Sequence, residues 1–147
     1  MRTRRVTLLR STRWDTDSCR NARMPRIILI VEDSEACAET LQIALETMAG
    51  LETRSVRGVK EALSVMADTS HEVAAVVTDL HMRKQDGFEL IGQLRDDPRY
   101  AAVPVLMVSG DSDPQLPQRA LKQGANAFFG KPYSPAAVRR TLEKMLC

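Results

Sequence analysis

The regular return of short apolar runs rich in β-branched residues is the strongest constraint on the fold of this chain. The clearest runs are residues 26–31, 73–78 and 104–108, and two weaker ones lie at 51–56 and 127–129. A short, continuous apolar run is typical of a strand buried on both faces of a parallel sheet. Because the five runs alternate with helical patterns, we predict an α/β domain: a doubly wound, five-stranded parallel sheet with five helices.

Apolar spacing and capping residues mark the helices between these runs. One helix is expected to end near Ala49, another to span about 88–96, and a shorter one to lie near 118–123. The last helix opens with Ser134 as its N-cap and Pro135 in its first turn, where both residue types are preferred.

The net charge of +2 averages two unlike parts of the chain. Residues 1–25 hold seven arginines and two acids, whereas residues 26–147 hold 14 basic and 17 acidic side chains. We therefore predict a basic, disordered leader over 1–25 and one domain over 26–147 that does not itself bind nucleic acid. Translation starting at Met24 is a further hypothesis, because that methionine stands directly before the first apolar run.

Cysteine usage and hydropathy exclude several classes of protein. The three cysteines include no CxxC pair, which argues against a disulfide scaffold or a zinc ribbon and predicts a reducing, cytoplasmic location. The apolar runs are far shorter than the roughly 18 residues of a membrane span. Cys37 is interpreted as a packing residue, and His71 is given no functional role.

Polar side chains follow four of the five apolar runs at the point where each run ends. They are Glu32 and Asp33, then Asp79, Ser109 and Lys131. In a doubly wound sheet the carboxyl ends of the strands form the edge where ligands bind. Taken singly, each residue is typical of a cap, a turn or a surface charge, so the prediction of a site depends on their conjunction.

Three converging carboxylates repel one another unless a cation lies among them. Oxygen ligands with retained water favour Mg²⁺, and no set of His and Cys ligands indicates zinc. A metal, the Lys131 ammonium and the Ser109 hydroxyl would together stabilise a phosphoryl group in transfer. Asp79 is then the predicted nucleophile, forming an acyl phosphate.

At this point the chain resembles the receiver domain of two-component response regulators, over about residues 26–147. The resemblance implies the flavodoxin-like receiver fold. It rests on the motifs Ile28–Asp33, Val77–Met82 followed by Asp86-Gly87, Pro104–Gly110 and Gly124–Pro132.

The resemblance implies a role for each matching residue. Glu32 and Asp33 would hold Mg²⁺, with Mn²⁺ as an alternative, and Asp79 would be both a metal ligand and the phosphoacceptor. The backbone carbonyl of His81 would complete the protein's ligands. Lys131 and Ser109 would contact the phosphoryl group.

Other positions are implied to respond to phosphorylation or to modify it. Phe128 would be the aromatic switch, here without the hydroxyl of a tyrosine, and the Lys131–Pro132 peptide would be cis. Arg83, Lys84 and Gln85 replace the more usual Pro-Gly-Met, which adds two positive charges to the loop.

The His81 and Asp111 side chains would lie beside the path of the hydrolytic water. We hypothesise that they set the lifetime of the phosphoryl group; the alternative is two solvated loop residues.

The predicted function is a phosphoacceptor receiver of a two-component or phosphorelay system, a signalling domain rather than an enzyme. The phosphoryl donor would be a histidine kinase or a histidine phosphotransfer protein. Without an output domain, the signal would pass to an unidentified protein effector. One alternative is a docking module that works without phosphorylation. A phosphatase is disfavoured because it needs a second Asp where His81 stands. A flavin protein is disfavoured because it needs a phosphate-binding loop where Ser34 lies.

Overall fold

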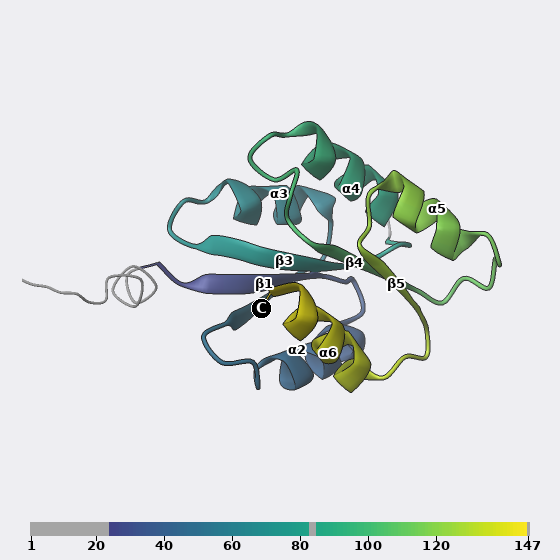
Figure 1. Ribbon diagram of the computed structural model, residues 1–147, viewed down its shortest axis with the longest axis horizontal. Helices are drawn as coiled ribbons and strands as arrows, with labels where there is room; N and C mark the ends of the chain where they lie inside the picture. The colour runs from purple at the N-terminus through teal and green to yellow at the C-terminus, as the bar shows by residue number, and fades with distance from the viewer. Residues whose placement is uncertain (1–23, 83–84, 147) are drawn as a thin grey trace, which may run out of the picture.

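The computed structural model describes residues 24–82 and 85–146, in which one parallel sheet lies between two layers of helices (Figure 1). The predicted basic leader falls almost entirely on residues 1–23, which lie outside the described residues. Arg83, Lys84 and Cys147 lie outside them as well. Among the described residues, no helix has the length and apolar character needed to cross a bilayer.

The sheet is entirely parallel, with its strands in the order β2-β1-β3-β4-β5. The strands are β1 (Arg26–Val31), β2 (Glu52–Val56), β3 (Glu72–Asp79), β4 (Val105–Ser109) and β5 (Ala127–Gly130). This is the doubly wound arrangement that the alternating pattern predicted. The direction of winding reverses between β1 and β3, and such a reversal opens a crevice at the carboxyl ends of those two strands.

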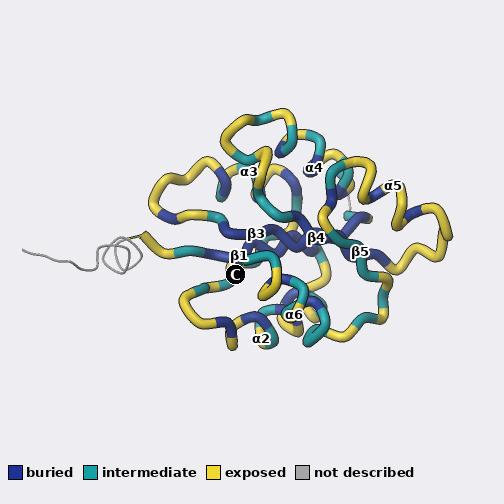
Figure 2. Tube along the Cα trace, viewed as in Figure 1, coloured by how far each residue is buried: buried dark blue, intermediate teal, exposed yellow. Residues whose placement is uncertain are grey.

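Helices cover both faces of the sheet, as Figure 1 shows. One layer holds α3 (Val59–Ala67), α4 (Gly87–Asp96) and α5 (Leu116–Gln123), and the other holds α2 (Glu35–Leu45) and α6 (Pro135–Leu146). Figure 2 shows that burial is concentrated in the strands between these two layers.

Strand β1 shows why its apolar run is continuous rather than alternating. Leu29 and Val31 pack with the layer of α3, α4 and α5, whereas Ile28 and Ile30 pack with the layer of α2 and α6. All four side chains are fully buried, and each such burial contributes about 1.5–3 kcal/mol. Because helices cover both faces, a polar side chain anywhere within this run would be buried. Polar residues therefore begin only where the strand ends.

Two predicted helix boundaries were wrong. The helix expected to reach Ala49 ends at Leu45 and continues as turns to Gly50, which adopts a φ of +78°. The helix placed near 118–123 begins earlier, at Leu116, with Pro117 in its first turn. Proline is tolerated there because the first-turn N–H groups have no partner within the helix.

Candidate functional site

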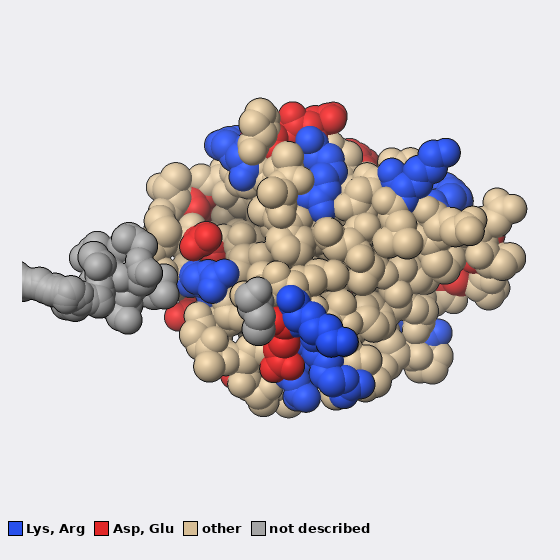
Figure 3. Space-filling view, in the orientation of Figure 1, with Lys and Arg blue, Asp and Glu red and all other residues tan. Residues whose placement is uncertain are grey.

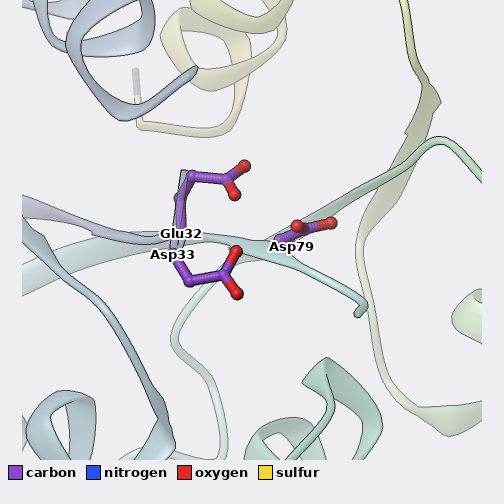
Figure 4. A group of neighbouring side chains, drawn as sticks. All are labelled: Glu32, Asp33 and Asp79. Atoms are coloured by element: carbon purple, nitrogen blue, oxygen red, sulfur yellow. The ribbon is translucent and has the colours of Figure 1, made fainter. Parts of the chain in front are cut away.

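Three carboxylates converge where β1 and β3 end, as predicted (Figure 4). Glu32 and Asp33 directly follow β1, and Asp79 is the last residue of β3. One oxygen of each carboxylate lies within 4.8 Å of an oxygen of the other two. Glu32 and Asp79 are only 2% and 6% exposed, and Asp33 is half-buried.

Strand pairing places these carboxylates side by side. Val31 of β1 pairs with Thr78 of β3, so the residues that follow each of them are neighbours. The backbone N–H of Glu32 donates to Val56 O of β2, and its Oε2 atom accepts from the Ser34 N–H at 3.1 Å. Main-chain bonds on both sides therefore hold Glu32 with its carboxylate turned toward Asp79.

The backbone at Gly87 packs closely against the backbone of Asp79 and Leu80. The Gly87 N–H, at the start of α4, donates to Leu80 O at 2.8 Å. A Cβ atom at Gly87 would lie 2.6 Å from the backbone oxygen of Asp79 and 3.0 Å from Met107 Cε. Only glycine fits this contact, since the nearest atom belongs to backbone that cannot turn aside.

Lys131 brings a cation from β5 to the same edge. It follows the last residue of β5, and its N–H donates to Ser109 O at 2.7 Å. Its Nζ atom donates to Glu32 Oε1 at 3.1 Å and to Asp79 Oδ2 at 3.4 Å. The Lys131–Pro132 peptide is cis, as expected.

The charges at this edge leave a negative excess. Burial raises the pKa of Glu32, and the charge of Asp79 acts in the same direction, opposed by the Ser34 N–H and by Lys131. Partial burial acts to lower the pKa of Lys131, but the bond to Glu32 and the charge of Asp79 outweigh it and the pKa is raised. One ammonium faces three carboxylates, and a divalent cation with oxygen ligands fits the remaining charge.

Ser109 and Phe128 lie on neighbouring strands. Ser109 is fully buried at the end of β4, and its Oγ atom accepts from the Asp111 N–H at 3.0 Å. Phe128 of β5 pairs with Met107 and is half-buried against the core under α3, α4 and α5.

His81 and Asp111 contact each other at the carboxyl edge of the sheet. A hydrogen bond of 3.0 Å joins His81 Nε2 to Asp111 Oδ2, between the loops that follow β3 and β4. Their side chains are 63% and 38% exposed. The Asp113 backbone N–H lowers the pKa of Asp111, and His81 adds to the effect.

The residue predicted to pack, Cys37, lies on the margin of this cluster, and His71, for which no functional role was predicted, lies away from it. His71 is buried, with Nε2 bonded to Val65 O at 2.8 Å near the start of β3, at the opposite edge of the sheet. Cys37 is half-buried in the first turn of α2. One contact had no signal in the sequence: Arg57 Nη2 donates to the backbone oxygen of Asp33 at 3.3 Å, which depends on the path of the β2–α3 loop.

Comparison with known proteins gives consistent matches. The family described as response regulator receiver domain matches residues 28–143. The chemotaxis protein CheY1 of Helicobacter pylori is 28% identical over 81% of this chain and 95% of its own length. A putative response regulator from Chloroflexus aurantiacus has a structure with a TM-score of 0.74 and 28% identity, covering 83% of this chain and 98% of that one.

Two other relatives are longer than the matched region. The sensory/regulatory protein RpfC of Xanthomonas campestris is 34% identical over 78% of this chain but only 16% of its own length. The transcriptional regulatory protein GltR of Pseudomonas aeruginosa is 29% identical over 82% of this chain, which spans about half of GltR, 49%. A family match over more than three quarters of the chain, together with the fold, shows that the chain belongs to the response regulator receiver domain family.

Proposed function

We propose that this receiver takes a phosphoryl group from a phosphohistidine onto Asp79, in a reaction that depends on Mg²⁺. The observation that carries the proposal is the convergence of three carboxylates and the Lys131 ammonium at one edge of the sheet. Lys131 contacts the Asp79 carboxylate that would become the acyl phosphate. Such a cluster costs free energy when its charges are unbalanced, and a metal and a phosphoryl group would balance them.

The ligands proposed for the metal are Glu32, Asp33, Asp79 and the backbone carbonyl of His81. Their donor atoms are all oxygens, which favours Mg²⁺, with Mn²⁺ as the alternative. When bound, the ion supplies positive charge to the phosphoryl oxygens. Glu32 and Asp33 would hold it beside Asp79, while the bond from the Ser34 N–H keeps Glu32 in place.

The chemical step is an in-line displacement at phosphorus. An Asp79 carboxylate oxygen forms the new O–P bond as the P–N bond of the donor breaks, and the electron pair of that bond stays on the imidazole nitrogen. The Lys131 ammonium neutralises charge on a phosphoryl oxygen. Ser109 would turn its hydroxyl toward another oxygen, and Phe128 would move with it as the aromatic switch.

His81 and Asp111 are proposed to set how long the phosphoryl group lasts. Their side chains are joined at 3.0 Å, two residues after Asp79 and two residues after Ser109, and we propose that they stand in the path of water to Asp79. Water that hydrolyses the acyl phosphate would then pass them, and the domain would take part in its own dephosphorylation.

The proposed partners are a histidine kinase or a histidine phosphotransfer protein, and then a protein effector, in the cytoplasm. Residues 26–147 hold 14 basic and 17 acidic side chains, and the face shown in Figure 3 carries both Lys and Arg and Asp and Glu side chains. This slightly acidic balance supports the proposal that the domain of residues 26–147 binds proteins rather than nucleic acid.

Labelling with acetyl phosphate tests the proposal. The full chain should gain one phosphoryl group in intact-mass spectra when Mg²⁺ is present, and none in EDTA. Asp79→Asn should abolish the gain, whereas Asp97→Asn, at the C-cap of α4, should keep it. Labelling that survives Asp79→Asn would refute the nucleophile, and an unlabelled wild-type chain would favour a docking module that works without phosphorylation.

A further inference from the structure

His71 is a buried histidine at the amino edge of the sheet, the edge where β1 and β3 begin (Figure 1). Its side chain is only 3% exposed. Its Nε2 atom lies 2.8 Å from Val65 O, near the end of α3. Because a carbonyl oxygen only accepts hydrogen bonds, Nε2 carries a proton and donates it to Val65 O. This bond fixes both the tautomer and the orientation of the imidazole ring.

The other ring nitrogen of His71 is buried without a partner. Nδ1 is shielded from solvent and has no hydrogen-bond partner within residues 24–82 and 85–146. Asp68 Oδ2 lies 3.9 Å from it, which is too far for a hydrogen bond. A nitrogen lone pair and a carboxylate oxygen that face each other at this distance are both electron donors, and they favour a cation between them.

Asp68 is held with one carboxylate oxygen toward His71. It is the C-cap residue of α3, and its Oδ1 atom accepts from the Ser70 N–H at 2.9 Å. The Ser70 N–H is the main cause of a lowered pKa of Asp68, so this carboxylate is ionised at neutral pH. A negatively charged oxygen and a histidine nitrogen therefore converge at the turn between α3 and β3.

The separation of these two atoms fits a metal ion bound to both. Zinc lies about 2.0–2.1 Å from a histidine nitrogen and about 2.0–2.2 Å from a carboxylate oxygen, so one ion spans up to about 4.2 Å. The observed 3.9 Å lies within that span. A histidine that binds a metal through one nitrogen usually donates from the other to a carbonyl or a carboxylate, as His71 does to Val65 O.

A cleft beside His71 has room for an ion and its water. Its volume is about 350 Å³, and Asp68, His71, Glu72 and Tyr100 are among the residues that line it. The Asp68 side chain is 49% exposed, so it can turn to admit an ion and then bind it. In the described part of the chain, no third His, Cys, Asp or Glu places a ligand atom within 4.8 Å of both. Water from the cleft completes the coordination, unlike a structural zinc site with four protein ligands.

We propose that His71 Nδ1 and Asp68 bind a divalent transition-metal ion of the zinc class at the amino edge of the sheet. One nitrogen and one oxygen ligand suit Zn²⁺ better than Mg²⁺, which prefers oxygen alone. The ion joins the end of α3 to the start of β3. Because a strand rises about 3.3 Å per residue, the site lies about 25 Å from Asp79 at the other end of β3. The zinc site is therefore independent of the proposed phosphorylation.

Nitrogen-15 NMR of the histidine side chains in the full chain tests the ligand atom directly. The sample is kept near neutral pH with excess Mg²⁺, which occupies the carboxylates at the other edge. Added Zn²⁺ should shift the Nδ1 resonance of His71, while Nε2 keeps its proton. If a large excess of zinc leaves the Nδ1 resonance unchanged, or if Nδ1 carries a proton that zinc does not displace, the proposal is wrong.

Hydrogen exchange tests the junction that the ion makes. Zinc should slow exchange severalfold in peptides covering 66–73, because it holds the α3–β3 turn, and should leave peptides covering 87–96 unchanged. Zinc bound only at a thiol or at the carboxylates of the other edge would not protect 66–73, and that result would overturn the proposal.

Three variants assign the protection to its ligands. His71→Gln should lose it but keep the fold, because the Gln amide can still donate to Val65 O. Asp68→Asn keeps the shape of the side chain, and it should need at least tenfold more zinc for the same protection. His81→Ala, which removes the other histidine near a carboxylate, should behave as the wild type. Zinc protection of 66–73 that survives His71→Gln, or that is lost in His81→Ala, would contradict the assignment.

Discussion

Lys131 pairs with two buried carboxylates at once, its Nζ atom lying 3.1 Å from Glu32 Oε1 and 3.4 Å from Asp79 Oδ2. Removing the ammonium leaves both carboxylates buried without a cation. We expect Lys131→Met to lower the free energy of unfolding in EDTA by about 1–3 kcal/mol, a range reduced because Lys131 is partly exposed.

Added Mg²⁺ should stabilise Lys131→Met more than the wild type, since the ion then meets an uncompensated charge. Urea unfolding followed by circular dichroism, with and without Mg²⁺, measures both effects. Lys122→Met, on the exposed side of α5, is the control and should match the wild type. If Mg²⁺ stabilised Lys131→Met and the wild type equally, the Lys131 ammonium would not be compensating the same carboxylates that Mg²⁺ binds.

Gly87→Ala should damage the site through the backbone. The new Cβ atom would lie 2.6 Å from Asp79 O, and overpacking of this kind costs about 1–3 kcal/mol. Because Asp79 must shift, labelling by acetyl phosphate should slow as well. Gly92→Ala is the matched control on the same helix, where nothing lies within 4 Å of the new atom; it should be neutral or stabilise by up to about 1 kcal/mol. Similar behaviour of the two variants would contradict this account.

The pKa of Asp111 should report the contact with His81 in solution. Carbon-13 NMR of the carboxyl group should show it below its usual value of 3.8, because the Asp113 N–H and then His81 favour the ionised form. In His81→Ala the pKa of Asp111 should rise toward 3.8 without reaching it, because the Asp113 N–H still donates to the carboxylate. Since folding depresses this pKa, its stabilising contribution is present above pH 3.8 and is lost as the pH falls below it. An Asp111 pKa that is the same in both proteins would mean that the contact does not form.

The lifetime of the acyl phosphate should depend on the same pair. If His81 and Asp111 stand in the path of water as proposed, His81→Ala and Asp111→Ala should each let water reach the phosphorus more easily, and dephosphorylation should speed up severalfold. Loss of label over time, followed by mass spectrometry, measures the rate. Ser112→Ala, at the exposed neighbour of Asp111, should leave it unchanged. The proposed tuning fails if neither His81→Ala nor Asp111→Ala alters the rate.

The sequence predicted the carboxylates because their positions follow from two buried strands, whereas Lys131 follows β5, a strand of only four residues. Continuous apolar runs leave little doubt about where β1 and β3 end, so Glu32 and Asp79 could be placed at one edge before any contact was known. The order of the strands is not visible in the sequence; the prediction needed only that a doubly wound sheet brings the carboxyl ends of these strands to one edge.

The contacts between loops could not be predicted in the same way. The helix ending at Leu45 rather than near Ala49 reflects turn geometry that apolar spacing does not encode. The hydrogen bond between His81 and Asp111 joins residues 30 positions apart, and the bonds of Arg95 go to backbone carbonyls, which have no residue signature. Such contacts depend on the path of the main chain after the core has formed.

Glu32 and Lys131 meet although 99 positions separate them in the chain, so no single fragment contains the chemistry. If the chain were divided in the exposed turn at 68–70, one piece would carry Glu32 and Asp33 and the other Asp79 and Lys131. Neither piece alone should take label from acetyl phosphate, and their mixture should do so only on reassembly. The phosphorylated fraction is therefore also a gauge of how much of the chain is correctly folded.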